Sequence, residues 1–127
     1  MQITIQKILN FSVFYAAVKD QKLPLKTAYH LSKLANAIDS EIQFYHNKLQ
    51  GIIAQYAEKD ENGQPKLTDD GMNIKLCAGV EEECYSAINE LQQLEVELPD
   101  IHFSIDDFAN VELTPIEFGA VMPFVED

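Results

Sequence analysis

The sequence predicts a mainly α-helical protein with a minor β component, formed as a single helical domain over residues 1–127. Three observations lead to this fold class. Apolar residues recur at helical spacing through residues 24–58, residues 5–20 are apolar on almost every side, and Thr-Pro-Ile-Glu at 114–117 has the form of a helix capping box. A hydrophobic content of 46% is sufficient for a buried core.

The N-terminal part predicts a short extended segment followed by a buried helix. Met1–Ile5 alternates apolar and polar residues, as a short strand does. The helix is expected over about 5–20, and most of its circumference should be buried because it is apolar nearly all round. Pro24 suits the first turn of the next helix, where its missing N–H costs no hydrogen bond.

One very long helix is expected over about 25–57, antiparallel to the first. Its apolar residues are separated by steps of three and four, and no proline interrupts it. About 30 residues would make a rod on the order of 45 Å long, which exceeds the diameter of a compact domain of this size. The rod must therefore be covered by the first helix, by a later helix or by another subunit. Its apolar stripe, which is also the candidate interaction surface, consists of Leu31, Leu34, Ile38, Ile42, Tyr45, Leu49, Ile52 and Tyr56.

The chain after the long helix predicts a small β-hairpin and a third helix that packs on the first two. Asn62-Gly63 and Asp70-Gly71 supply the left-handed backbone angles of tight turns. The hairpin is expected over residues 66–76, with residues 101–105 as an optional addition to it. The third helix is expected over about 79–95.

Two capping signals organise the C-terminal part. Ser104 with Asp107 predicts a capped turn, and Thr114 with Glu117 opens a short helix over about 115–122 that the following proline stops. The residues expected to form the core are Ile8, Phe11, Tyr15, Leu31, Leu34, Ile38, Ile42, Tyr45, Leu49, Ile52, Ile88, Leu91, Phe103, Phe118 and Val121.

The net charge is −12, from 9 basic residues, all of them Lys, and 21 acids. Such a balance argues against nucleic-acid binding by a basic face. The charge is also uneven, because residues 1–57 hold six Lys and three acids, whereas residues 58–127 hold three Lys and 18 acids. Either the acids solvate the outer faces of the second half, or an acidic patch binds a basic partner or the basic half of a neighbouring copy. The candidate acidic patch consists of Glu81, Glu82, Glu83, Asp106 and Asp107.

The loop over residues 58–69 partly matches a calcium-binding loop. With Gly63 in sixth place, the acidic and amide ligands fall on positions 1, 3, 5 and 12, but the first is Glu rather than Asp and no helix follows. A turn without a cation is the favoured interpretation, and a cation site is the alternative. The four residues concerned are Glu58, Asp60, Asn62 and Asp69.

No constellation of residues predicts catalysis, a cofactor or a metal. Cys77 and Cys84 have no second cysteine pair and are expected to be small buried residues. The three histidines, His30, His46 and His102, are scattered along the chain. Neither a nucleophile elbow nor a glycine-rich phosphate loop is present in the sequence, so we expect a non-enzyme.

Four stretches of the sequence, in order along nearly the whole chain, carry a family resemblance. They resemble a group of small uncharacterised proteins encoded by tailed bacteriophages and by prophages of gut and low-GC bacteria. The resemblance implies a phage origin and a helical domain, and it implies no catalytic or binding residues. The stretches are Leu23–Leu34, Tyr56–Gly63, Leu94–Pro99, and Leu113–Pro115 with Met122–Asp127.

Two functions follow as hypotheses. The first is a non-enzymatic structural or assembly component of the phage, which acts through a protein partner or as a homo-oligomer. The alternative is an acidic inhibitor of a host nucleic-acid-binding or defence protein. Neither requires a cofactor, a small-molecule substrate, nucleic acid or a membrane. The sequence has no apolar run of roughly 20 residues and no signal-peptide cleavage site, so we expect the host cytoplasm or the virion.

Overall fold

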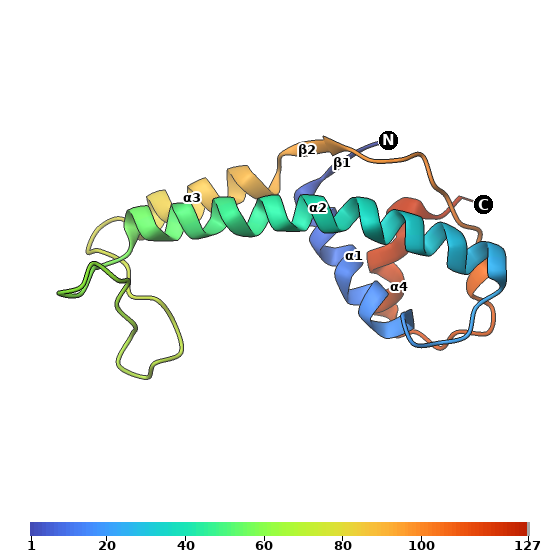
Figure 1. The fold of residues 1–127 in the computed structure, drawn as a ribbon, viewed down its shortest axis with the longest axis horizontal. Coiled ribbons are helices and arrows are strands. Elements are labelled where there is room, and N and C mark those ends of the chain that lie inside the picture. The colour runs from blue at the N-terminus through green and yellow to red at the C-terminus, as the bar shows by residue number, and fades with distance from the viewer. Residues whose placement is uncertain (127) are drawn as a thin grey trace. The chain divides into compact units, whose positions relative to one another are not determined.

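The computed structural model describes residues 1–126 and is mainly helical, with one very long helix, as predicted (Figure 1). Two short 3-10 helices cover Ile105–Phe108 and Met122–Phe124. In chain order, the other elements are β1 (Gln2–Thr4), α1 (Ile5–Val18), α2 (Leu25–Tyr56), α3 (Glu81–Gln92), β2 (Glu95–Glu97) and α4 (Pro115–Val121).

The chain forms two compact units, and α2 contributes to both. The first unit consists of Met1–Gln43 and the chain from Glu95 onwards. The second unit is Phe44–Leu94. The single domain expected from the sequence stays a prediction.

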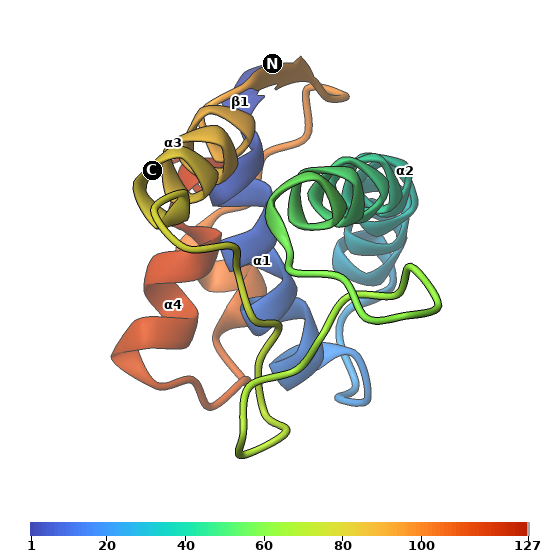
Figure 2. The ribbon, with the colours of Figure 1, turned by 90° about the vertical axis from the view of Figure 1, so that its left-hand side faces the viewer.

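The core of the first unit lies between α1, the first part of α2, and α4. Figure 1 shows α1 and α2 running in opposite directions, as expected, and Figure 2 also shows α4 beside α1. Aromatic side chains fill the centre: the rings of Phe11 and Phe124 lie 5.2 Å apart, and those of Phe14 and Phe108 also 5.2 Å. The α2 residues in this core are Leu31, Leu34 and Ile38.

The small sheet lies elsewhere than the sequence indicated. β1 pairs with β2 in antiparallel register, with Ile3 opposite Val96. The expected hairpin over 66–76 contains only an isolated antiparallel bridge between Leu67 and Ile74. The Lys75 N–H donates to the Lys66 carbonyl oxygen and the Thr68 N–H donates to the Asn73 carbonyl oxygen, and these two bonds do not extend into paired strands. Residues 101–105 do not join it, since Phe103 forms a bridge with Val125 instead.

The helix ends follow local signals. In α4, the Glu117 N–H donates to Thr114 Oγ1 at 3.2 Å and the Thr114 N–H donates to Glu117 Oε1 at 2.9 Å, which confirms the capping box. The Ser104–Asp107 cap is also confirmed, because the Ser104 N–H donates to Asp107 Oδ2 at 2.9 Å. α3 is shorter than the predicted 79–95, because Gly79 has a positive φ of 82° and the chain becomes extended again at β2.

In the second unit, α3 packs against the last part of α2. The Gln92 amide donates to the Tyr45 hydroxyl at 3.2 Å, and Cys84 and Leu91 of α3 are buried.

Of the predicted core residues, nine are buried: Ile8, Phe11, Leu31, Leu34, Ile38, Tyr45, Leu91, Phe103 and Val121. The other six are half-buried: Tyr15, Ile42, Leu49, Ile52, Ile88 and Phe118. Within residues 1–126, no helix has both the length and the hydropathy to cross a bilayer.

Candidate protein-interaction site

The second unit carries a groove whose walls come from three segments of the chain. α2 supplies Ile53, the loop between α2 and α3 supplies Met72 and Ile74, and α3 supplies Tyr85 and Ile88. We call these five residues the unit 2 groove. Its volume is about 730 Å³, within the range of ~300–1,000 Å³ that is common for binding pockets. The size and the apolar walls make it a candidate binding site.

Three large apolar side chains of the unit 2 groove are exposed to solvent. The exposed fraction is 80% for Met72, 64% for Tyr85 and 36% for Ile74. Single exposed apolar residues are ordinary on a protein surface, but several around one depression are typical of an interaction site. The groove therefore has the composition expected of a surface that another molecule covers.

Backbone hydrogen bonds shape the loop that carries Met72 and Ile74. The Glu58 N–H donates to the Lys75 carbonyl oxygen at 2.9 Å, and the N–H groups of Lys66 and Lys75 donate to the carbonyl oxygens of Glu58 and Lys66, each at 2.8 Å. The Glu58 carboxylate also lies 3.5 Å from both lysine Nζ atoms. Exposed ion pairs contribute little, so the backbone bonds define this part of the loop.

A second turn places Met72 beside the groove. The Thr68 hydroxyl and the Met72 N–H both donate to Asp70 Oδ1, and Gly71 follows with a positive φ of 71°. The Thr68 hydroxyl, and next the Met72 N–H, stabilise the ionised carboxylate and lower the pKa of Asp70 from its usual value of 3.8. The turn thus favours the charged form of the Asp70 carboxylate.

The loop over residues 58–69 has the geometry of a turn. The Asp60 carboxylate accepts the N–H groups of Asn62 and Gln64, each at 2.9 Å, and Gly63 has a φ of 77°. Glu58, the expected first ligand, faces the two lysines instead. Across residues 1–126, no three His, Cys, Asp or Glu side chains gather as a metal site would require. The turn itself is therefore formed, and the absence of a bound cation stays a prediction.

The first turn of α3 carries three acids, and one of them lines the groove. Glu81 lines the groove itself, while Glu82 and Glu83 lie with Glu90 around a depression on the opposite face of α3. All four are exposed, and none makes an ion pair with any residue that the structure describes. Their negative charge is therefore available to a partner.

The other two residues of the predicted acidic patch belong to the first unit. Asp107 accepts the Ser104 N–H at 2.9 Å and the Thr27 hydroxyl at 3.4 Å, so capping and packing explain its position. Asp106 is exposed in the same 3-10 helix. The five predicted residues are thus divided between the two units.

The chain itself covers part of the apolar stripe of α2. Leu31, Leu34 and Ile38 are buried in the core of the first unit, and Ile42 packs against that core. In the second unit Tyr45 is buried, and the remaining stripe residues, Leu49, Ile52 and Tyr56, are half-buried. A buried side chain offers little to a partner, so the exposed apolar surface has to be sought elsewhere on the chain. For the half-buried residues, a role in partner binding stays a prediction.

The cysteines and histidines are not brought together. Cys84 is buried, as predicted, and Cys77 is half-buried. His102 Nε2 lies 2.6 Å from Asp100 Oδ1, and its Nδ1 lies 3.6 Å from Glu126 Oε1. His30 and His46 lie on α2. The non-enzymatic character expected from the sequence stays a prediction.

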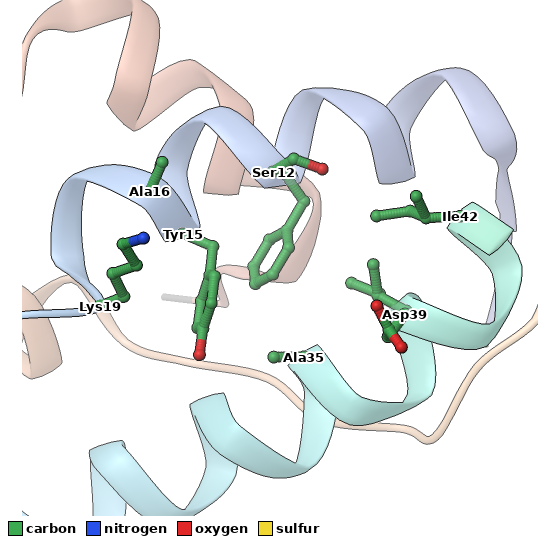
Figure 3. A pocket seen from close by; sticks show the side chains of 9 residues that line it. Ser12, Tyr15, Ala16, Lys19, Ala35, Asp39 and Ile42 are labelled. Atoms are coloured by element: carbon green, nitrogen blue, oxygen red, sulfur yellow. The ribbon is translucent and has the colours of Figure 1, made fainter. Parts of the chain in front are cut away.

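A smaller pocket in the first unit lies between α1 and α2 (Figure 3). Tyr15 points toward α2 near Ala35, and Lys19 and Asp39 lie on opposite sides of it. The volume is about 260 Å³, below the ~300 Å³ at which ordinary binding pockets begin. We treat this pocket as a gap between packed helices.

No protein-family model, curated protein or solved structure matches the chain. The phage resemblance therefore stays a prediction.

The groove residues Met72, Ile74 and Tyr85 were not identified from the sequence as a site. Tyr85 lies three residues before Ile88, which the sequence predicts for the core, and Tyr85 itself is 64% exposed. The only sequence signal for Met72 is its place directly after an Asp-Gly turn.

Proposed function

We propose that the chain acts without catalysis, through protein–protein interaction, as a structural or assembly component of a tailed bacteriophage or prophage. The role would be that of a virion, connector or tail-associated protein or an assembly chaperone, in the host cytoplasm or in the particle. The observation that supports it is the unit 2 groove, whose exposed apolar side chains resemble the core of a protein interface. The phage assignment depends on the sequence resemblance.

The experiment combines particle composition with a groove variant. Mass spectrometry of purified particles and assembly intermediates should detect the protein at a fixed copy number. An allele with Tyr85→Asp should lower the particle yield, because a charge in an apolar interface is costly. Ile116→Asp is the matched control, since Ile116 is 79% exposed on α4 and lies outside the groove. A protein absent from particles and intermediates, together with a normal yield for Tyr85→Asp, would overturn the proposal.

The second candidate function is inhibition of a basic host protein that binds nucleic acid or acts in defence. The observation in its favour is the set of exposed, unpaired carboxylates on α3, which would replace the phosphates of nucleic acid. A purified host nucleic-acid-binding protein should then be released from nucleic acid by the wild-type chain at low salt, and not by the Glu82→Lys/Glu83→Lys variant. Equal release by both proteins would exclude these carboxylates as the inhibitory surface.

A further inference from the structure

The first part of α2 presents an exposed strip that is both apolar and basic. Leu25 is 88% exposed and Tyr29 is 60% exposed, one helical turn apart. Lys26 and Lys33 lie on the same side at spacings of three and four from Tyr29, and both are exposed. We call these four residues the α2 strip. It lies opposite the face that is buried in the core.

Positive charge is concentrated around the α2 strip. Residues 19–33 contain four of the nine Lys of the chain and a single acid, Asp20. In residues 1–126, no carboxylate pairs with any of these four lysines. On a chain with a net charge of −12, this segment is the one where another acidic surface would be attracted rather than repelled.

The unit 2 groove has the complementary character. Its exposed apolar residues lie beside the Glu81 carboxylate, whereas Glu82 and Glu83 of the same helical turn lie on the opposite face of α3. The lysine on its wall, Lys75, is already paired with Glu58 at 3.5 Å. An amphipathic helix with apolar residues at i and i+4 and lysines beside them is the kind of partner that such a groove binds.

We propose that the occupant of the unit 2 groove is a second copy of this chain, which inserts its α2 strip. Leu25 and Tyr29 of one copy contact Met72, Ile74 and Tyr85 of the next, and the lysines of the strip face Glu81. This inference rests on the proposed function of the groove as a protein-binding site. Because the strip and the groove are different surfaces, the association is head-to-tail and yields a ring or an open chain of copies.

The test uses two variants that each disable one surface. Tyr29→Asp alters the strip, Tyr85→Asp alters the groove, and both side chains are exposed, so circular dichroism should show an unchanged fold. Size-exclusion chromatography with light scattering should find oligomers for the wild type at micromolar concentration and monomers for each variant alone. An equimolar mixture of the two variants should give a dimer of one copy each, because each supplies the surface that the other lacks.

Salt dependence and a control variant provide two further tests of the self-association. The oligomer should dissociate as the salt concentration rises, since opposite charges at the rim are screened. Ile116→Asp should associate as the wild type does. A monomeric wild type, variants that still assemble alone, or a mixture that remains monomeric would each overturn the self-association.

These experiments distinguish a failure of the self-association from a failure of the proposed assembly function. If the wild type is monomeric while Tyr85→Asp lowers particle yield, the groove binds a different protein and only the self-association is wrong. If the variants form the mixed dimer while Tyr85→Asp leaves the yield normal, the self-association is correct and the assembly function is wrong.

Discussion

Asp70 shows how one carboxylate orders the loop beside the groove. The hydrogen bonds from Thr68 and Met72 lower its pKa in the folded chain below the unfolded value. The contribution of the ionised form to stability is therefore present above the unfolded pKa and is lost as pH falls through the lower, folded pKa. We expect the turn around Met72 to loosen only in acid, below a pH of about 4.

Carbon-13 NMR of the Asp70 carboxyl group measures its pKa directly. Its titration midpoint should lie below the usual 3.8 and should move up toward that value in Thr68→Val, which removes the hydroxyl donor and keeps the side-chain shape. A midpoint that Thr68→Val leaves in place would show that the hydroxyl does not stabilise the charge.

Leucines on opposite faces of α2 form a second comparison at the residue scale. Leu34 has no exposed surface and lies in the core of the first unit, whereas Leu25 is 88% exposed. Leu34→Ala leaves a cavity and should lower the free energy of unfolding by about 2–5 kcal/mol. Leu25→Ala should change it by no more than about 0.5 kcal/mol. Urea denaturation of the two variants measures both, and equal losses would place Leu34 outside a packed core.

The glycines of the helix and of the loop lead to opposite predictions. Gly51 lies inside α2 with open space where a Cβ would be, so Gly51→Ala should stabilise the chain by about 0.5–1 kcal/mol. Gly63 has a φ of 77°, which disfavours any L side chain, so Gly63→Ala should destabilise the loop by roughly 1 kcal/mol. Thermal unfolding of both variants tests the pair, and stabilisation by Gly63→Ala would contradict the left-handed turn.

Local signals explain which elements could be predicted from the sequence. α1, α2 and the Thr114–Glu117 cap depend on residues within four positions of one another, and their spacing is visible in the sequence. The pairing of β1 with β2 joins distant parts of the chain, and no short-range pattern specifies it. For the same reason no short-range pattern predicts the unit 2 groove, because which face of α3 is covered depends on the loop that precedes it.

At the scale of the whole molecule, side-chain burial is unequal between the two units. Nine of the ten largest fully buried side chains belong to the first unit, and Cys84 is the one in the second. Local opening requires less free energy where less apolar surface is buried, so amide hydrogens of α3 should exchange faster than those of α1. Hydrogen exchange measured on Tyr85→Asp avoids protection by self-association. Equal protection of α1 and α3 would instead mean that the two units open together as one cooperative structure.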